Sequence, residues 1–363
     1  MATKSATWAY RDRFHESFAR TYFRRFADCL VSSVGVGTYL GESTDAADER
    51  YHDAIVESLE SGVNVVDTAI NYRNQRSERV VGEAIRDADV DREAVMVSTK
   101  GGFVPFDGER PNDASAYIES EFLDTGVLDR EDLVMGNSLA PDFLEWSLDR
   151  SLSNLDLETI DLYYIHNPEA QLAQFDRETV YENLEDAFTR LEKRAAAGDI
   201  RHYGVATWEA FRVQPDHEKY LSLPEVVSRA RTASDRAGTG GTHFRAIQLP
   251  FNVHMADAFS LSAHEGADGT RSALWFANDA GIDVFTSASI LQGDLAAEGE
   301  IPDAVDAKLS GETPAQRAIN FARSAPGVTS ALVGTGSPDH AAENVAAGTF
   351  APMGADAFDS IFR

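Results

Sequence analysis

Cysteine and lysine are both scarce in this chain of 363 residues. The single cysteine, Cys29, excludes an intrachain disulfide and any metal site built on paired cysteines. It fits a reducing compartment, and we expect a cytoplasmic protein. Only five of the 32 basic residues are lysines, and the other 27 are arginines.

Long apolar runs are also missing. No stretch of about 18 consecutive apolar residues occurs, so no membrane-spanning helix is expected. The first 30 residues carry Arg, Asp and Glu throughout, and they contain no apolar segment typical of a signal peptide. Apolar residues still make up 43% of the chain, which is enough for one large α/β domain or two ordinary ones.

Positive charge is far outnumbered by negative charge. The 60 acidic and 32 basic residues give a net charge of −28. Such a field repels nucleic acid and anionic membranes, so neither is expected as a partner. An acidic, lysine-poor surface is typical of cytoplasmic proteins from salt-accumulating halophiles, where a Debye length of about 3 Å screens the self-repulsion. An acidic protein from an ordinary mesophile is the alternative.

Short β-branched segments alternate with helical patterns along the chain. Strands are expected over residues 32–37, 63–67, 94–100, 159–166, 200–206, 244–250, 282–289 and 328–334. Helices are expected over 47–62, from about Ser77, over 177–197, over 270–280, and after the capping pairs Thr313-Pro314 and Ser337-Pro338. Eight strand–helix units predict a parallel sheet closed into a (β/α)8 TIM barrel. The competing fold is an open doubly wound sheet. It usually carries G-x-G-x-x-G after its first strand, whereas Gly35-Val36-Gly37-Thr38-Tyr39-Leu40 lacks the last glycine.

Several regions fall outside a minimal barrel over residues 31–350. Residues 1–30 form an N-terminal extension and residues 351–363 a C-terminal tail. Long insertions are expected at 101–140, which could act as a lid, and at 208–243. Within the extension, residues 8–28 are expected to form an amphipathic helix that closes the bottom of the barrel. Its apolar face would consist of Phe18, Tyr22, Phe23 and Phe26.

Four titratable side chains stand at or just after the ends of expected strands. Asp67, Lys100 and His166 end the second, third and fourth strands, and Tyr72 follows Asp67 by five residues. The strand ends of a (β/α)8 barrel meet at one mouth. Taken alone, such an Asp or His is more often a cap or a structural residue. Lys100, however, ends the apolar run AVMVST, where a buried ammonium needs a partner that Asp67 can supply.

This arrangement predicts a site that handles protons. A tyrosine hydroxyl has a pKa of about 10, and a nearby ammonium lowers that pKa by favouring the phenolate. Asp67 would hold Lys100 and limit the effect, while His166 orients a carbonyl and shares the proton transfer. A hydride delivered to the carbonyl carbon would then be matched by a proton from Tyr72. Protein side chains supply no hydride, so the sequence predicts a nicotinamide cofactor.

The segments that carry these residues resemble the aldo-keto reductase family. SGVNVVDTAINYRNQRSERVVGEAI looks like the family signature, in which a tyrosine follows an aspartate by five residues and S-E-x-x-x-G-x-A comes next. The likeness runs from about residue 31 to residue 350, interrupted by the two insertions. It continues in AVMVSTKGG, TIDLYYIHNP, IRHYGVAT, IQLPFNV and APGVTSALVGTGSPDHAAENVAA.

The resemblance implies NAD(P)H-dependent reduction of a small-molecule aldehyde or ketone. Tyr72 would be the general acid, and Asp67, Lys100 and His166 would complete a catalytic tetrad. No metal is implied. Expected cofactor contacts are Thr38, Asp67, Thr207, Gln248, Ser287, Ala288, Ile290, Gln292, Gly334, Thr335, Gly336, His340, Glu343 and Asn344. From position alone, Tyr39, Phe103 and Phe106 are expected to line the substrate pocket.

Some cofactor positions depart from the family pattern. Ser287 stands where members often have an aromatic residue, and Ala206-Thr207 replace a Ser-Asn pair. Gly334 and His340 replace the Lys and Arg that clamp the 2′-phosphate of NADP in many members. NADH use therefore stays open. NADP(H) is favoured over NAD(H), because some subfamilies with this glycine pattern still take NADP.

Two other functional classes remain open. A cofactor-binding sensor or regulatory subunit, like the potassium-channel β-subunits of this fold, would bind cofactor tightly with slow or no turnover. A metal-dependent barrel hydrolase would need a His/Asp cluster at the strand ends, of which only Asp67 and His166 are present. The sequence does not specify the oligomeric state.

Overall fold

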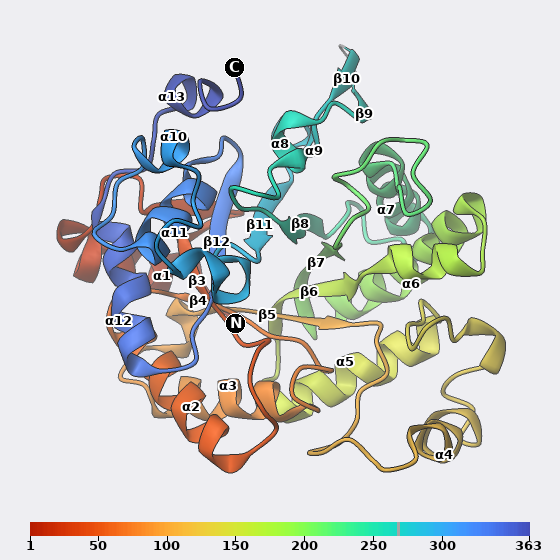
Figure 1. The fold of residues 1–363 in the computed structure, drawn as a ribbon. Helices are drawn as coiled ribbons and strands as arrows, with labels where there is room; N and C mark the ends of the chain where they lie inside the picture. Colours follow the sequence, from red (N-terminus) through yellow and green to blue (C-terminus); the bar gives the residue numbers. More distant parts are fainter. Residues whose placement is uncertain (267–268) are drawn as a thin grey trace.

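The computed structural model describes residues 1–266 and 269–363 (Figure 1). Eight parallel strands close into a barrel in the order β11-β12-β3-β4-β5-β6-β7-β8, which confirms the predicted (β/α)8 fold. Each strand begins and ends within two residues of its predicted range. The barrel strands are Val34–Gly37 (β3), Val65–Asp67 (β4), Met96–Gly101 (β5), Ile160–His166 (β6), Ile200–Ala206 (β7), Phe244–Pro250 (β8), Asp283–Ser287 (β11) and Val328–Gly334 (β12).

A helix follows each barrel strand in the chain. These helices are Asp45–Glu60 (α2), Arg76–Asp87 (α3), Pro141–Leu155 (α5), Arg177–Ala197 (α6), Leu223–Ala237 (α7), Ala273–Ala280 (α9), Pro314–Ser324 (α11) and Pro338–Ala346 (α12). Thr313 and Ser337 cap α11 and α12 as predicted, because their side chains accept hydrogen bonds from backbone N–H groups three residues later. Within the described ranges, no helix has both the length and the apolar character needed to cross a bilayer.

The N-terminal region differs from the helix predicted over residues 8–28. The helix Lys4–Phe14 (α1) ends early, and Phe23–Phe26 (β1) pairs antiparallel with Cys29–Ser32 (β2). Phe26 and Val31 of this hairpin pack in one apolar cluster with residues from seven of the barrel strands. The hairpin lies where the barrel strands begin, because β2 leads directly into β3. Burial inside the barrel therefore accounts for Phe26, whereas Phe18, Tyr22 and Phe23 belong to a separate apolar cluster.

The two predicted insertions differ from each other in structure. Residues 101–140 contain the short helix Ala114–Ile118 (α4), and Phe122 and Leu128 of this segment form an apolar cluster with Phe143 of α5. Figure 1 shows α4 at the periphery, beyond the barrel. Residues 208–243, predicted as a second insertion, contain α7, the helix that follows β7, which is the fifth barrel strand along the chain. Only part of this segment is therefore additional to the regular alternation of strands and helices.

The remaining elements are short. Strands His264–Gly266 (β9) and Gly269–Arg271 (β10) form a hairpin, so the helix predicted over 270–280 begins only at Ala273. The other α-helices are Asp257–Ser260 (α8), Asp303–Asp306 (α10) and Ala355–Asp359 (α13). Short segments of 3-10 or π-helix occupy His15–Ser17, Arg92–Ala94, Glu119–Leu123, Arg130–Asp132, Pro168–Ala173, Leu291–Ala296 and Ala347–Thr349.

Glycine is required at the end of β5, next to Lys100. A Cβ atom on Gly101 would lie 2.0 Å from the phenolic oxygen of the fully buried Tyr163. Real Cβ atoms do not approach other atoms this closely, so any larger residue must displace either the tyrosine or the strand.

Replacing Gly101 with alanine is therefore expected to lower the free energy of unfolding by about 1–3 kcal/mol, as overpacking of a core usually does. Urea unfolding followed by circular dichroism measures the change. Gly241→Ala is the matched control, since a Cβ there meets no atom within 4 Å. Equal stability of Gly101→Ala and the wild type would contradict the close contact.

Candidate active site

The centre of the candidate site is a buried ion pair between adjacent strands. Lys100 Nζ donates hydrogen bonds to Asp67 Oδ2 at 2.5 Å and to the backbone oxygen of Thr68 at 2.7 Å. Ser98 Oγ and Gln248 Nε2 donate to Asp67 Oδ1 at 2.7 and 2.8 Å. The parallel register of β4 and β5 places Asp67 opposite Ser98. Both charges are thus held by hydrogen bonds inside the barrel, as buried charges must be.

Tyr72 and His166 lie over this pair. Lys100 Nζ is 4.7 Å from the centre of the Tyr72 ring, and the Tyr72 and His166 rings are 5.9 Å apart at 75°. The structure therefore brings together all four of the residues predicted to meet at the strand ends. Tyr72 and His166 are half-buried, whereas Lys100 and Asp67 are buried.

Burial and the charge of Lys100 together determine the protonation states of Tyr72 and His166. Burial raises the pKa of the Tyr72 phenol, and the ammonium of Lys100 only partly opposes that rise. The predicted lowering of this pKa is therefore not found. Burial disfavours the charge on Lys100, but Asp67 and Tyr72 outweigh it and raise the pKa of Lys100. Burial and the Lys100 charge hold the pKa of His166 well below its usual value, so the imidazole is neutral at pH 7.

The loop that follows Tyr72 has an uncommon backbone conformation. Arg73, Asn74 and Gln75 have φ values of 48°, 56° and 68°. Residues other than glycine seldom adopt this left-handed region. Three such residues in succession persist only where the surrounding structure fixes them.

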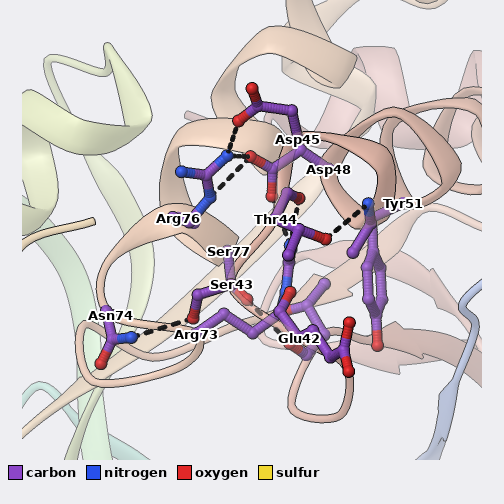
Figure 2. A network of polar contacts seen from close by, with 12 residues as sticks. Glu42, Ser43, Thr44, Asp45, Asp48, Tyr51, Arg73, Asn74, Arg76 and Ser77 are labelled. Carbon is purple, nitrogen blue, oxygen red and sulfur yellow. Dashed lines mark hydrogen bonds and ion pairs between the residues drawn. The ribbon is translucent and has the colours of Figure 1, made fainter. Parts of the chain in front are cut away.

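A polar network fixes one side of this loop against the start of α2 (Figure 2). The guanidinium of Arg73 is buried, donates to the backbone oxygen of Glu42 at 3.0 Å and pairs with Asp48. Asn74 Nδ2 donates to Ser43 Oγ at 2.9 Å. The network therefore joins the loop bearing Tyr72 to the loop between β3 and α2.

Gln75 fixes the other side of the loop. Its Nε2 donates to the backbone oxygen of Phe106 at 3.0 Å, and its Oε1 accepts from Arg150 Nε at 2.7 Å and from Asn154 Nδ2 at 3.1 Å. Phe106, which we expected in the substrate pocket, thus supports the loop after Tyr72.

A cleft of about 340 Å³ opens beside the ion pair. This volume is typical of sites that bind small molecules. Tyr39 and Tyr72 form part of the wall, and their rings are 5.0 Å apart. Ten of the fourteen predicted cofactor residues also line it: Thr38, Asp67, Gln248, Ser287, Ala288, Ile290, Gln292, Gly334, Gly336 and His340.

The other four predicted cofactor residues do not line this cleft. Thr335 and Asn344 are buried, and Asn344 Nδ2 donates to Thr335 Oγ1 at 3.1 Å. Thr207 is also buried, and its backbone N–H donates to the oxygen of Gln248 at 2.8 Å. Glu343 is half-buried on α12. The hydrogen bond between Asn344 and Thr335 thus joins the loop after β12 to α12.

One wall of the cleft was not predicted. Ala47, Arg50 and Tyr51 of α2 line it. Their spacing of three and four residues places them on one face of the helix. Tyr51 also packs in the apolar core with Ile55 and Leu59, so its helical spacing alone indicates the core and not the cleft. Nothing in the local sequence distinguishes Arg50 from other exposed arginines.

A second cavity of about 490 Å³ lies near the C-terminal ends of β6 and β7, where Asn167 and Trp208 line it. Phe103 lines it and packs edge-to-face on His166 at 5.1 Å. The half-exposed Trp208 and the buried Glu169 line it too. Of the three predicted substrate residues, Tyr39 therefore lines the first cavity and Phe103 the second. Within the described residues, no group of three or more His, Cys, Asp or Glu side chains is placed to hold a metal ion.

The four residues at the strand ends lie within a segment that matches a known family. Residues 33–221 match the model described as the aldo/keto reductase family. This chain belongs to that family. The match covers the segment from β3 to the loop after β7 and so includes Asp67, Tyr72, Lys100 and His166.

Curated relatives of this aldo/keto reductase differ in their described roles. It is 24% identical over 335 residues to a putative voltage-gated potassium channel subunit beta of Schizosaccharomyces pombe, covering 88% of this chain and 85% of that protein. It is 26% identical over 215 residues to the NADH-specific methylglyoxal reductase of Escherichia coli, and that match covers 58% of each protein.

Solved structures share the fold over nearly the whole chain. An aldo-keto reductase from Klebsiella pneumoniae in complex with NADPH has a TM-score of 0.60 and 20% identity, covering 92% of this chain and 91% of that one. A glycerol dehydrogenase from Gluconobacter oxydans has a TM-score of 0.64 and 17% identity, covering 95% of each chain. At these identities the likeness concerns the fold alone.

The network in Figure 2 yields a prediction about stability. Asp48 pairs with Arg73, whose side chain is 1% exposed, and with Arg76. Asp48→Asn is expected to cost about 2 kcal/mol of unfolding free energy, because it leaves a buried guanidinium without its carboxylate. The measurement is urea unfolding. Asp45→Asn is the matched control, since the Asp45 side chain is fully exposed and, within residues 1–266 and 269–363, pairs with Arg76 alone. Equal losses in the two variants would contradict the importance of the Arg73 contact.

Proposed function

We propose that this aldo/keto reductase reduces an aldehyde or ketone to an alcohol with NAD(P)H. The observation that carries the proposal is the meeting of Tyr72 and His166 over the buried Lys100–Asp67 pair, at the edge of a cleft. The substrate is expected to be a small carbonyl compound. A nucleic-acid partner is not expected, because the net charge is −28.

The cleft has features that suit a nicotinamide dinucleotide. Gln248 lines it next to Asp67, where its amide could bind a carboxamide. Ala288 and Gln292 have φ values of 52° and 57°, and such strained backbone often occurs at ligand sites. A Cβ on Gly334 would meet no atom within 4 Å, so the backbone there is open to a ligand. A nicotinamide bound in this cleft would supply a hydride to the carbonyl carbon.

Each residue of the site has a role in the proposed reaction. The Tyr72 phenol stays protonated near neutral pH and gives its proton to the carbonyl oxygen as negative charge develops there. The Lys100 ammonium lies against the tyrosine ring and stabilises the phenolate that remains. Asp67 holds the ammonium in place. His166, which is neutral, can donate a hydrogen bond that orients the carbonyl.

Tyr72→Phe tests this mechanism. The variant removes the proton donor and keeps the ring, so we expect kcat to fall by about 10²–10⁴-fold, the usual contribution of a general acid. Cofactor binding, followed by fluorescence titration, should change little. Tyr117→Phe in the 101–140 insertion is the control and should retain activity. Wild-type turnover by Tyr72→Phe on a panel of aldehydes and ketones would refute the assignment.

A second candidate function is a cofactor-binding sensor or regulatory subunit. The likeness to the channel subunit beta of Schizosaccharomyces pombe, over 88% of this chain, favours it. Such a protein would bind NAD(P)H tightly and turn over slowly or not at all. Single-turnover measurements with bound cofactor distinguish the two functions. The complete set of Tyr72, Lys100, Asp67 and His166 leads us to prefer the enzyme.

Cofactor choice is part of the proposal, with NADP(H) ahead of NAD(H). The neighbouring structure from Klebsiella pneumoniae contains NADPH, whereas the Escherichia coli relative is NADH-specific.

We also propose that residues 31–350 function as the barrel, with 1–30 as an extension and 351–363 as a tail.

We further propose that the protein is adapted to a salt-accumulating cytoplasm of the haloarchaeal type. Its net charge is −28, and many of its arginines pair with carboxylates on the surface. Self-repulsion between the remaining carboxylates destabilises the fold at low salt, and molar salt screens it.

Thermal unfolding in potassium chloride tests this adaptation. We expect the unfolding midpoint to rise by several degrees between about 0.1 M and about 2 M KCl, because the Debye length falls from about 10 Å to below 3 Å. Sucrose solutions, which stabilise by exclusion without screening charge, serve as the control. A midpoint independent of KCl would overturn the halophilic interpretation and favour an ordinary acidic protein.

A further inference from the structure

One end of the cofactor cleft is built jointly by α2 and the loop after β12. Gly334, Gly336 and His340 line this end from one side, and Arg50 and Tyr51 line it from the other. The two sides are in contact, since a Cβ on Gly336 would lie 3.9 Å from the Tyr51 ring. Figure 1 likewise shows α2 and α12 side by side.

Arg50 is the one permanently cationic residue among the described residues that line this cleft. It is exposed, and no carboxylate lies within ion-pair distance of it in the described part of the chain. The acids in the first turn of α2 do not neutralise it. Asp45 pairs with Arg76, and Asp48 pairs with Arg73 and Arg76 (Figure 2). An unpaired guanidinium facing a cleft is notable in a chain with a net charge of −28.

The position of Arg50 indicates which phosphate it would meet. Tyr72, Asp67 and Gln248 line the cleft beside the ion pair, where the proposed function places the nicotinamide, whereas Arg50 lines it from α2, next to Gly336 and α12. The end lined by Arg50 would then receive the adenosine half of the dinucleotide. In that half, NADP differs from NAD by a phosphomonoester on the ribose, and the planar fork of an arginine matches such a group.

Resting on the proposed function, we infer that Arg50 binds the 2′-phosphate of NADP(H). Gly334 and His340 occupy the positions of the family's Lys–Arg clamp and carry no permanent positive charge. Arg50 would supply that charge from α2. Selection of NADP(H) over NAD(H) would then depend on a helix on the far side of the cleft from the usual clamp.

Arg50→Gln tests the inference through cofactor binding alone. Fluorescence titrations with NADPH and NADH should be made at one fixed KCl concentration, because salt weakens an exposed phosphate contact. We expect the Kd for NADPH to rise about ten-fold or more, which corresponds to about 1.4 kcal/mol. The Kd for NADH should change less than about two-fold, because NADH lacks the phosphate. Arg20→Gln is the control, since Arg20 is exposed and does not line the cleft.

The possible outcomes separate this inference from the proposed function. Unchanged NADPH binding by Arg50→Gln would overturn the inference and leave the function intact. Equal weakening of NADPH and NADH would also overturn it, because Arg50 would then contact a phosphate common to both. A wild-type protein that binds neither cofactor would overturn the inference and the function together. Loss of the NADPH preference in Arg50→Gln, but not in Arg20→Gln, would support the inference.

Discussion

The candidate site depends on one interaction, the buried ion pair between Lys100 and Asp67. An ammonium inside a barrel carries a desolvation cost of several kcal/mol unless a carboxylate and further hydrogen bonds offset it. Here the carboxylate comes from the adjacent strand, and Ser98 and Gln248 bond its second oxygen. This arrangement needs a particular register between β4 and β5, and it brings in β8 from across the barrel. The closed barrel is therefore what makes a charged pair tolerable at this depth.

The loop after Tyr72 has a strained backbone next to the buried Lys100–Asp67 pair. The polar network of Figure 2 holds this loop in place. Arg73, Asn74 and Gln75 are left-handed residues that leave Tyr72 close to the Lys100 ammonium. Contacts from α2 on one side and from Phe106 and Arg150 on the other hold them there. The long segment after β5 thus supports the tyrosine loop in addition to forming a small apolar cluster with α5. The same contacts therefore fix the loop after Tyr72 and the position of the Tyr72 ring beside the Lys100 ammonium.

The barrel and the meeting of four side chains at its strand ends could be predicted from the sequence, because apolar strand runs that end in polar residues are a clear local signal. The sequence-based prediction failed where a contact between residues distant in sequence determines the structure. Phe23 and Phe26 fit a helical stripe, but they lie in a hairpin in which Phe26 is buried against seven barrel strands and Phe23 packs against the separate cluster around Tyr22. In the sequence, Arg50 does not differ from other exposed arginines. Its place in the cleft follows only from the packing of α2 beside the loop after β12. The sequence predicted a lowered pKa for Tyr72, whereas burial raises it more than the Lys100 charge lowers it, and burial depends on tertiary packing.

Salt should act differently on the two cations of the site. Lys100 is fully buried, and its partner Asp67 lies within hydrogen-bond distance, so mobile ions cannot come between them. Arg50 is exposed, and at molar salt the Debye length of about 3 Å is comparable to the length of a direct contact. Under the proposed roles, high salt leaves proton transfer by Tyr72 intact while it weakens long-range attraction of an anionic cofactor. Selection between cofactors must then rest on direct, bidentate contact, which a guanidinium provides and an ammonium does not.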